Sequence, residues 1–228
     1  MDRHAWDERY ASEELVWSAG PNQFLVAEVP GPAPDGGRAL DVACGEGRNA
    51  IWLGEQGWQV TAADFSAVAL QKGARLAAAR DVDVQWVEAD LTRWDPPAHG
   101  FDLVIVFYLQ LDGDGRAAAL TRACRAVAPG GTLLFVAHAA DNLVRGVGGP
   151  QDAAVLYSPG EVVDLVATAG LTIEKADHVE RTVTTPDGDR VAVDVLVRAV
   201  RPLAGADAGA DAGPGAEATA AEGRQEGA

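Results

Sequence analysis

One glycine-containing turn carries most of the chemistry that can be recognised in this sequence. Residues 40–50 read LDVACGEGRNA, in which an apolar run enters a turn and an alanine-rich stretch leaves it. Gly45 and Gly47 permit a tight turn and a close approach of a ligand to the backbone. The amides at the start of the following helix favour a negatively charged group. Gly45, Gly47 and Ala50 also fit the G-x-G-x-x-A spacing of dinucleotide sites.

The acid in front of this turn bears on the choice of cofactor. Asp41 lies four positions before Gly45, at the end of the expected strand. A carboxylate there repels a pyrophosphate but suits a cationic amino group. S-adenosylmethionine carries such an amine, together with a carboxylate and a sulfonium, and has no phosphate. The plainer alternative is that Asp41 only caps the turn.

Two further acids follow the next two apolar runs. Asp64 ends the run in VTAADFS and can accept hydrogen bonds from two ribose hydroxyls, in either cofactor class. Phe65 could lie against an adenine, and Ser66 is expected to cap the next helix. Asp90 follows the third run, where it could accept from the adenine amino group while the Leu91 amide donates to a ring nitrogen. Acids at three successive strand ends around one turn favour a nucleoside-binding site.

The segments that must position these residues alternate between two types of sequence. Short β-rich runs are separated by alanine-rich, helix-compatible stretches, which favours βαβ units and a parallel sheet. The strands are expected at residues 39–43, 59–63, 82–87, 103–108, 132–137, 171–183 and 191–200. The helices between them are expected at residues 49–56, 67–80 and 116–128, and one more is expected to begin after Ser158 and end at Gly170.

The last two strands differ from the others because no helix separates them. TPDGD joins them, so they must pair antiparallel. The expected fold is therefore a doubly wound, Rossmann-like α/β sheet of seven strands: five parallel strands plus a C-terminal antiparallel hairpin, with helices on both faces. Residues 1–37 are expected to form a helical lid, 38–202 the cofactor-binding domain, and 203–228 a disordered acidic tail rich in alanine and glycine.

The successive motifs LDVACGEGRN, VTAADFS, VEADL, FDLVIV and APGGTLLF resemble those of class I S-adenosylmethionine-dependent methyltransferases. The N-terminal WDERY segment resembles, more narrowly, the thiopurine and tellurite type of small-molecule methyltransferase. The resemblance implies S-adenosylmethionine as cofactor and S-adenosylhomocysteine as product. Ala43 departs from the family, which most often has glycine there. With the spacing arguments above, the expected cofactor-binding residues are Asp41, Ala43, Cys44, Gly45, Gly47, Asn49, Asp64, Phe65, Ser66, Asp90, Leu91 and Phe107.

Residues near the methyl acceptor follow from their positions at the ends of later strands. Tyr108 ends the fourth strand and could orient the acceptor, and His138 ends the fifth and could act as a general base. Each has a plainer interpretation, as a tyrosine at the edge of the core and as a structural histidine. Further acceptor-site candidates are Tyr10, Trp17, Gln110 and Arg145. No metal site is expected.

The composition of the chain limits the classes of molecule that it is expected to bind. The net charge of −16 disfavours nucleic acid, and no apolar run is long enough to cross a membrane. We therefore expect a cytoplasmic enzyme, monomeric or homodimeric, that transfers a methyl group to a sulfur, oxygen, nitrogen or metalloid atom of a small molecule. Two alternatives stay open. One is an NAD(P)-dependent oxidoreductase, and the other is a regulatory protein that binds S-adenosylmethionine without catalysis.

Overall fold

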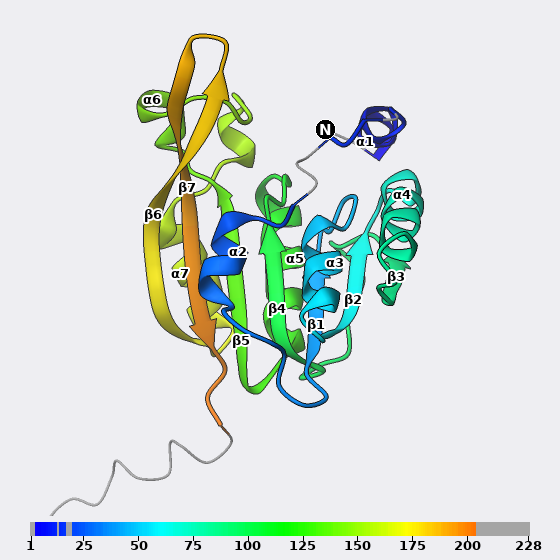
Figure 1. Ribbon diagram of the computed structural model, residues 1–228. Helices are drawn as coiled ribbons and strands as arrows, with labels where there is room; N and C mark the ends of the chain where they lie inside the picture. Colours follow the sequence, from blue (N-terminus) through cyan, green and yellow to red (C-terminus); the bar gives the residue numbers. More distant parts are fainter. Residues whose placement is uncertain (1–2, 13, 17–19, 204–228) are drawn as a thin grey trace, which may run out of the picture.

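A single mixed sheet of seven strands organises the computed structural model of the chain (Figure 1). The structure describes residues 3–12, 14–16 and 20–203. The order of strands across the sheet is β3-β2-β1-β4-β5-β7-β6. The strand bounds are β1 Arg38–Val42, β2 Gln59–Asp64, β3 Val84–Glu88, β4 Phe101–Phe107, β5 Val127–His138, β6 Thr172–Thr185 and β7 Gly188–Val200.

The strand pairing confirms the predicted topology. Strands β1 to β5 run parallel to one another, whereas β7 runs antiparallel to both β5 and β6. Successive strands are added on one side of β1 up to β3, and β4 and β5 are then added on its other side. The carboxyl ends of β1 and β4 therefore form the switch point where ligands bind in open α/β sheets. The expected strand ranges agree with the observed ones to within a few residues, except that β5 begins at Val127 rather than at Thr132.

Three of the described helices connect parallel strands that follow one another in the chain. The bounds of the helices are α1 Arg3–Tyr10, α2 Gln23–Glu28, α3 Arg48–Glu55, α4 Ala67–Ala78, α5 Gly113–Ala126, α6 Asn142–Arg145 and α7 Pro159–Thr168, with a 3-10 turn at Ala153–Val155. Hydroxyl caps start two of them as the sequence predicts. The side chain of Ser66 accepts from the Ala69 amide, and that of Ser158 accepts from the Glu161 amide. Helix α6 and the 3-10 turn were not expected from the sequence.

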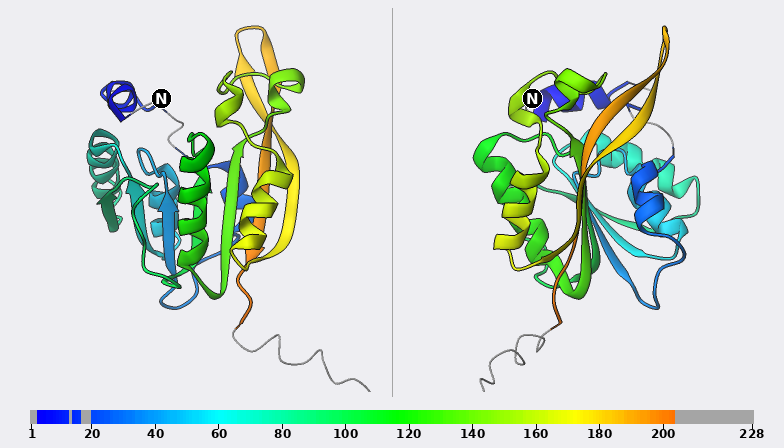
Figure 2. Two further views of the ribbon diagram at one scale, coloured as in Figure 1. Left: turned by 180° about the vertical axis from the view of Figure 1, so that it is seen from behind. Right: turned by 90° about the vertical axis from the view of Figure 1, so that its left-hand side faces the viewer.

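Helices cover both faces of the sheet (Figure 2). On one face, α5 and α7 pack over a core that includes Leu120, Phe135 and Val166. On the other face, α2 and α3 cover a core that includes Leu25 and Ile51. The sheet thus has an apolar core on each side, which explains why β4 is apolar along almost its whole length.

The carboxyl edge of the parallel strands is flanked on both sides. The upper part of the β6–β7 hairpin projects beyond this edge on one side, and α1 lies above it on the other (Figure 1). Helix α1 is tied to the body of the protein by a small cluster in which Trp6 and Tyr10 pack with Ala69, Phe65 and Val16. Within the described residues, no helix has the length and apolar character needed to span a membrane.

Candidate active site

A pocket opens at the carboxyl ends of β1, β2 and β4. The turn after β1, the acid that ends β2, residues 90–92 after β3 and residues 107–111 at the end of β4 line it, and Trp6, Tyr10 and Leu15 of the N-terminal segment complete it. It therefore lies where the sheet order places a ligand site. The expected cofactor residues on its wall are Ala43, Cys44, Gly45, Asn49, Asp64, Phe65, Asp90, Leu91 and Phe107. Asp41, Gly47 and Ser66 lie behind that wall.

Asp41 is the least satisfied polar side chain near this pocket. It is 1% exposed, and neither carboxylate oxygen has a hydrogen-bond partner among the described residues. Burial, followed by the nearby charge of Asp64, raises the pKa of Asp41 from 3.8 to about 8, while the Ala50 backbone amide and the charge of Arg48 act in the opposite direction. Burying a carboxylate that accepts no hydrogen bond of ordinary geometry is costly, and a cationic group in the pocket lowers that cost beyond what Arg48 provides. The residue thus fits the ammonium group of S-adenosylmethionine and does not fit a pyrophosphate.

Asp64 holds the glycine turn in shape. One carboxylate oxygen accepts from the Gly45 amide at 2.9 Å, and the other accepts from the Ser66 amide at 2.9 Å. Burial raises the pKa of this carboxyl group, and the hydrogen bonds from the backbone act in the opposite direction. Each carboxylate oxygen has a second lone pair, so Asp64 keeps the capacity to accept from ribose hydroxyls.

Ala43, Gly45 and Gly47 of the turn all adopt left-handed backbone conformations, and Ala43 and Gly47 illustrate two different consequences. Ala43 has φ 62°, a region that favours glycine, which gives a physical reason for the family's preference at that position. Gly47 has φ 77°, and a Cβ atom there would lie 2.3 Å from the ring of Trp86. The space beside Gly47 is therefore filled by a tryptophan of β3. Close packing, rather than the approach of a ligand, requires glycine at this position.

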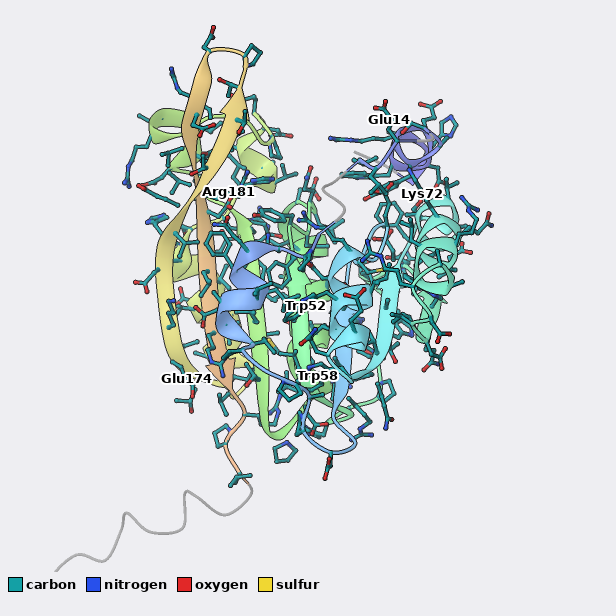
Figure 3. All side chains as sticks on the ribbon, viewed as in Figure 1. Glu14, Trp52, Trp58, Lys72, Glu174 and Arg181 are labelled. Atoms are coloured by element: carbon teal, nitrogen blue, oxygen red, sulfur yellow. The ribbon has the colours of Figure 1, made fainter. Side chains whose placement is uncertain are left out.

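The N-terminal segment is fastened to the same turn by buried charges that the sequence analysis did not single out. The Lys72 ammonium group lies 2.7 Å from Glu46 and donates to the carbonyl oxygens of Ser12 and Glu14. The Glu46 carboxylate in turn accepts from the Val16 amide. Figure 3 labels Lys72 on α4, next to Glu14 of the N-terminal segment. A lysine facing an acid 26 positions away leaves no pattern in the sequence.

A second polar cluster lies at the end of β4. The Tyr108 hydroxyl donates to Asp194 at 2.8 Å and accepts from the side-chain amide of Asn22 at 3.3 Å. Burial raises the pKa of Tyr108 well above its usual value, and Asp194 raises it further. The residue has φ 53°, another left-handed conformation. Tyr108 therefore lines the pocket as a neutral phenol whose proton is directed at Asp194, which suits positioning and does not suit a base.

The other acceptor-site candidates differ in their placement. Tyr10 and Gln110 line the pocket, whereas Trp17 lies outside the described residues. His138 is buried behind Tyr108, with ring centroids 4.6 Å apart, and its Nδ1 faces Asp194 at 3.3 Å. It is not part of the pocket wall. Arg145 is exposed, pairs with Asp141, and also lies away from the wall.

Comparison with known proteins agrees with this geometry. Residues 39–131 match the family described as a methyltransferase domain. This segment, called the matched segment below, begins in β1 and contains the glycine turn and all three strand-end acids. Among the described residues, no group of three or more histidine, cysteine, aspartate or glutamate side chains is arranged to hold a metal ion.

Curated relatives match somewhat less than half of the chain. The uncharacterized methyltransferase Rv0089 of Mycobacterium tuberculosis is 32% identical over 108 residues, which are 47% of this chain and 54% of that protein. A demethylmenaquinone methyltransferase of Thermus thermophilus is 35% identical over 101 residues, 43% and 46% of the two chains. A ribosomal RNA small subunit methyltransferase C of Chromohalobacter salexigens also matches, at 35% over 111 residues, 46% and 33%. The chain thus matches about half, or less, of the length of these relatives.

A solved structure extends the likeness to the whole fold. It is described as "Conversion of a Disulfide Bond into a Thioacetal Group during Echinomycin Biosynthesis", and it superposes with a TM-score of 0.72 at 24% identity. The match covers 90% of this chain and 94% of that one. The Rossmann-like fold, including the antiparallel hairpin that follows the matched segment, is therefore confirmed for this chain.

Proposed function

We propose that the chain is an S-adenosylmethionine-dependent methyltransferase that acts on a heteroatom of a small molecule. The observation that carries the proposal is the buried carboxylate of Asp41 behind the glycine turn, neither oxygen of which accepts a hydrogen bond of ordinary geometry. Asp41 lies at the carboxyl end of β1, the strand in which the matched segment begins. The curated relatives bear methyltransferase names, which supports the same reaction.

The residues divide the cofactor contacts among them. Asp41 pairs with the ammonium group, and Asp64 accepts from the ribose hydroxyls. Asp90 and Leu91 meet the adenine, with Phe65 against its ring. The cofactor supplies a methyl group already activated on a sulfonium. The protein therefore has to align donor and acceptor and exclude water, for which Trp6 and Tyr10 of α1 form a cover.

A small-molecule acceptor is supported by charge and by the walls of the pocket. The net charge of −16 opposes the approach of a phosphate backbone. The hairpin and α1 flank the carboxyl edge of the parallel strands on opposite sides (Figure 1). Because the pocket lies at this edge, the two elements limit the approach of a large acceptor. The relative named as a demethylmenaquinone methyltransferase points the same way, whereas the relative named for ribosomal RNA makes RNA the acceptor class to test against.

Calorimetric titration of the full chain with S-adenosylmethionine, S-adenosylhomocysteine and NADPH tests the cofactor. We expect micromolar binding of the two sulfur nucleotides and no binding of NADPH. Binding of NADPH alone overturns the proposal and makes Asp64 a dinucleotide ribose ligand.

Transfer of a radiolabelled methyl group to thiols, phenols and amines, with small ribosomal subunits in parallel, tests the acceptor. Labelling of the ribosomal subunits alone overturns the small-molecule assignment. Cofactor binding without transfer to any acceptor favours a regulatory protein.

A further inference from the structure

One carboxylate joins three elements of the fold beside the pocket. Asp194 of β7 has an exposed fraction of 0%. Its Oδ2 accepts from the Tyr108 hydroxyl at 2.8 Å and from Nε of Arg181 at 2.7 Å, while its Oδ1 faces Nδ1 of His138 at 3.3 Å. A fully buried carboxylate with three partners of this kind fixes the orientation of each of them.

Arg181 keeps its binding capacity after this contact. Only its Nε is used, and its two terminal nitrogens make no hydrogen bond within the described part of the chain. The side chain is 23% exposed, so these nitrogens are neither sealed in the core nor freely mobile at the surface. Their four N–H groups remain for a ligand.

Arg181 is not one of the residues that line the pocket, but its guanidinium group lies beside one of them, a position called the pocket rim below. Its central carbon lies 5.9 Å from the ring centroid of Tyr108, which lines the pocket. Figure 3 places Arg181 on the hairpin, above the carboxyl ends of the parallel strands. Arg48, on the pocket wall, is close enough for the positive charge of Arg181 to lower its pKa, although burial lowers it more. Two arginines therefore converge on the side of the pocket next to Tyr108.

We propose that Arg181, held in place by Asp194, binds a carboxylate group of the methyl acceptor. The outer edge of a guanidinium group presents two parallel N–H donors, which match the two oxygens of a carboxylate. The hydrogen bond from Nε to Asp194 holds that edge in one orientation, so little entropy is lost on binding. Asp194 acts as a positioning residue and Arg181 as the binding residue. This inference rests on the proposed function for the identity of the ligand as a methyl acceptor.

Benzoate and its neutral analogue benzamide test the site directly. Each is titrated into the full chain by calorimetry, with and without saturating S-adenosylhomocysteine. We expect saturable binding of benzoate and at least tenfold weaker binding of benzamide. Arg181→Gln is expected to lower benzoate affinity at least tenfold while leaving benzamide binding and S-adenosylhomocysteine affinity unchanged. Arg190→Gln, which removes an exposed arginine from the same hairpin, is the matched control and leaves all three affinities unchanged.

Two variants separate positioning from folding. Asp194→Asn is expected to weaken benzoate binding while S-adenosylhomocysteine affinity is retained, a selective loss that general unfolding does not produce. The double variant Arg181→Gln/Asp194→Asn removes both charges, so the fold does not have to bury an unpaired carboxylate. It is expected to melt close to the wild type and still fail to bind benzoate.

The outcomes distinguish this inference from the proposed function. Absence of benzoate binding to the wild type, or equal binding to the wild type and to Arg181→Gln, overturns the carboxylate site. If S-adenosylhomocysteine fails to bind but benzoate binding depends on Arg181, the proposed methyltransferase function fails while the anion site stands.

Discussion

The ammonium group of Lys72 lies 2.7 Å from the carboxylate of Glu46, and the two side chains are 10% and 4% exposed. Glu46 belongs to the glycine turn, and Lys72 also donates to the backbone of the N-terminal segment. The pair therefore joins the cover of the pocket to the turn that forms the pocket floor.

Replacing Lys72 is expected to loosen this cover. Lys72→Met removes the positive charge that faces the buried Glu46 carboxylate, which should lower the free energy of unfolding by about 3 kcal/mol. Cleavage after Arg9 by trypsin should accelerate at the same time. Urea denaturation and limited proteolysis measure the two effects. Lys175→Met is the matched control because Lys175 pairs with Glu28 at the surface, with side chains 40% and 16% exposed, and should cost about 1 kcal/mol or less. If the two variants lose the same free energy of unfolding, the Lys72–Glu46 pair does not hold the N-terminal segment on the pocket.

The raised pKa of Asp41 predicts a pH dependence of stability. The folded-state pKa of about 8 lies above the usual 3.8, so the neutral acid is favoured in the folded protein. Its contribution to stability is complete below pH 4 and is lost as the pH rises through 8. Asp41→Asn removes this loss. Without cofactor, the variant should be more stable than the wild type at pH 8, by on the order of a few kcal/mol. If the free energy of unfolding changes with pH in the same way in the wild type and in Asp41→Asn, the raised pKa of Asp41 is contradicted.

Cofactor binding should release the proton held by Asp41. An ammonium group beside the carboxylate favours ionisation, so affinity for S-adenosylhomocysteine should rise with pH between 6 and 7, by up to tenfold. Calorimetry in two buffers with different ionisation enthalpies measures the proton released. In Asp41→Asn, affinity should fall at pH 7.5 and the proton release should disappear. If the wild type releases no proton on binding, the ammonium group of the cofactor does not lie beside Asp41.

Asp64 is expected to contribute through both the ribose and the turn. Asp64→Asn keeps the size of the side chain but loses the charge-assisted hydrogen bonds from Gly45 and Ser66, so we expect at least tenfold weaker binding of S-adenosylmethionine. Asp64→Ala should weaken binding further because no acceptor remains. Equilibrium dialysis measures both affinities. Asp102→Asn, at the opposite end of the sheet, serves as control. Unchanged affinity in both Asp64 variants removes it from the site.

Replacement of His138 tests whether methyl transfer uses a general base. It lies behind Tyr108 and bonds Asp194, so His138→Asn should alter turnover only if the acceptor must lose a proton. We expect the acidic limb of the pH–rate profile to change while cofactor affinity stays constant. Profiles that coincide with the wild type, measured on any acceptor found in the screen, assign His138 a structural role.

The local features of the chain could be predicted from its sequence because they depend on nearby residues. Alternating apolar and alanine-rich runs specify strands and crossover helices, and the absence of a helix before TPDGD specifies the hairpin. The helix caps at Ser66 and Ser158 follow from hydroxyl groups just before each helix. Asp41, Asp64 and Asp90 were predicted to converge because parallel strands present their carboxyl ends at one edge.

Contacts between distant segments were decided only by the tertiary structure. The partnership of Asp194 with Tyr108, His138 and Arg181 depends on how the hairpin pairs with β5 and projects beyond the sheet. Burial decided the charge states as well. Nothing in the sequence around Asp41 distinguishes a solvated carboxylate from one without a partner, because desolvation depends on the whole surrounding fold. Arg145 and Arg181 are alike as sequence letters, and only packing places one at the open surface and the other at the pocket rim.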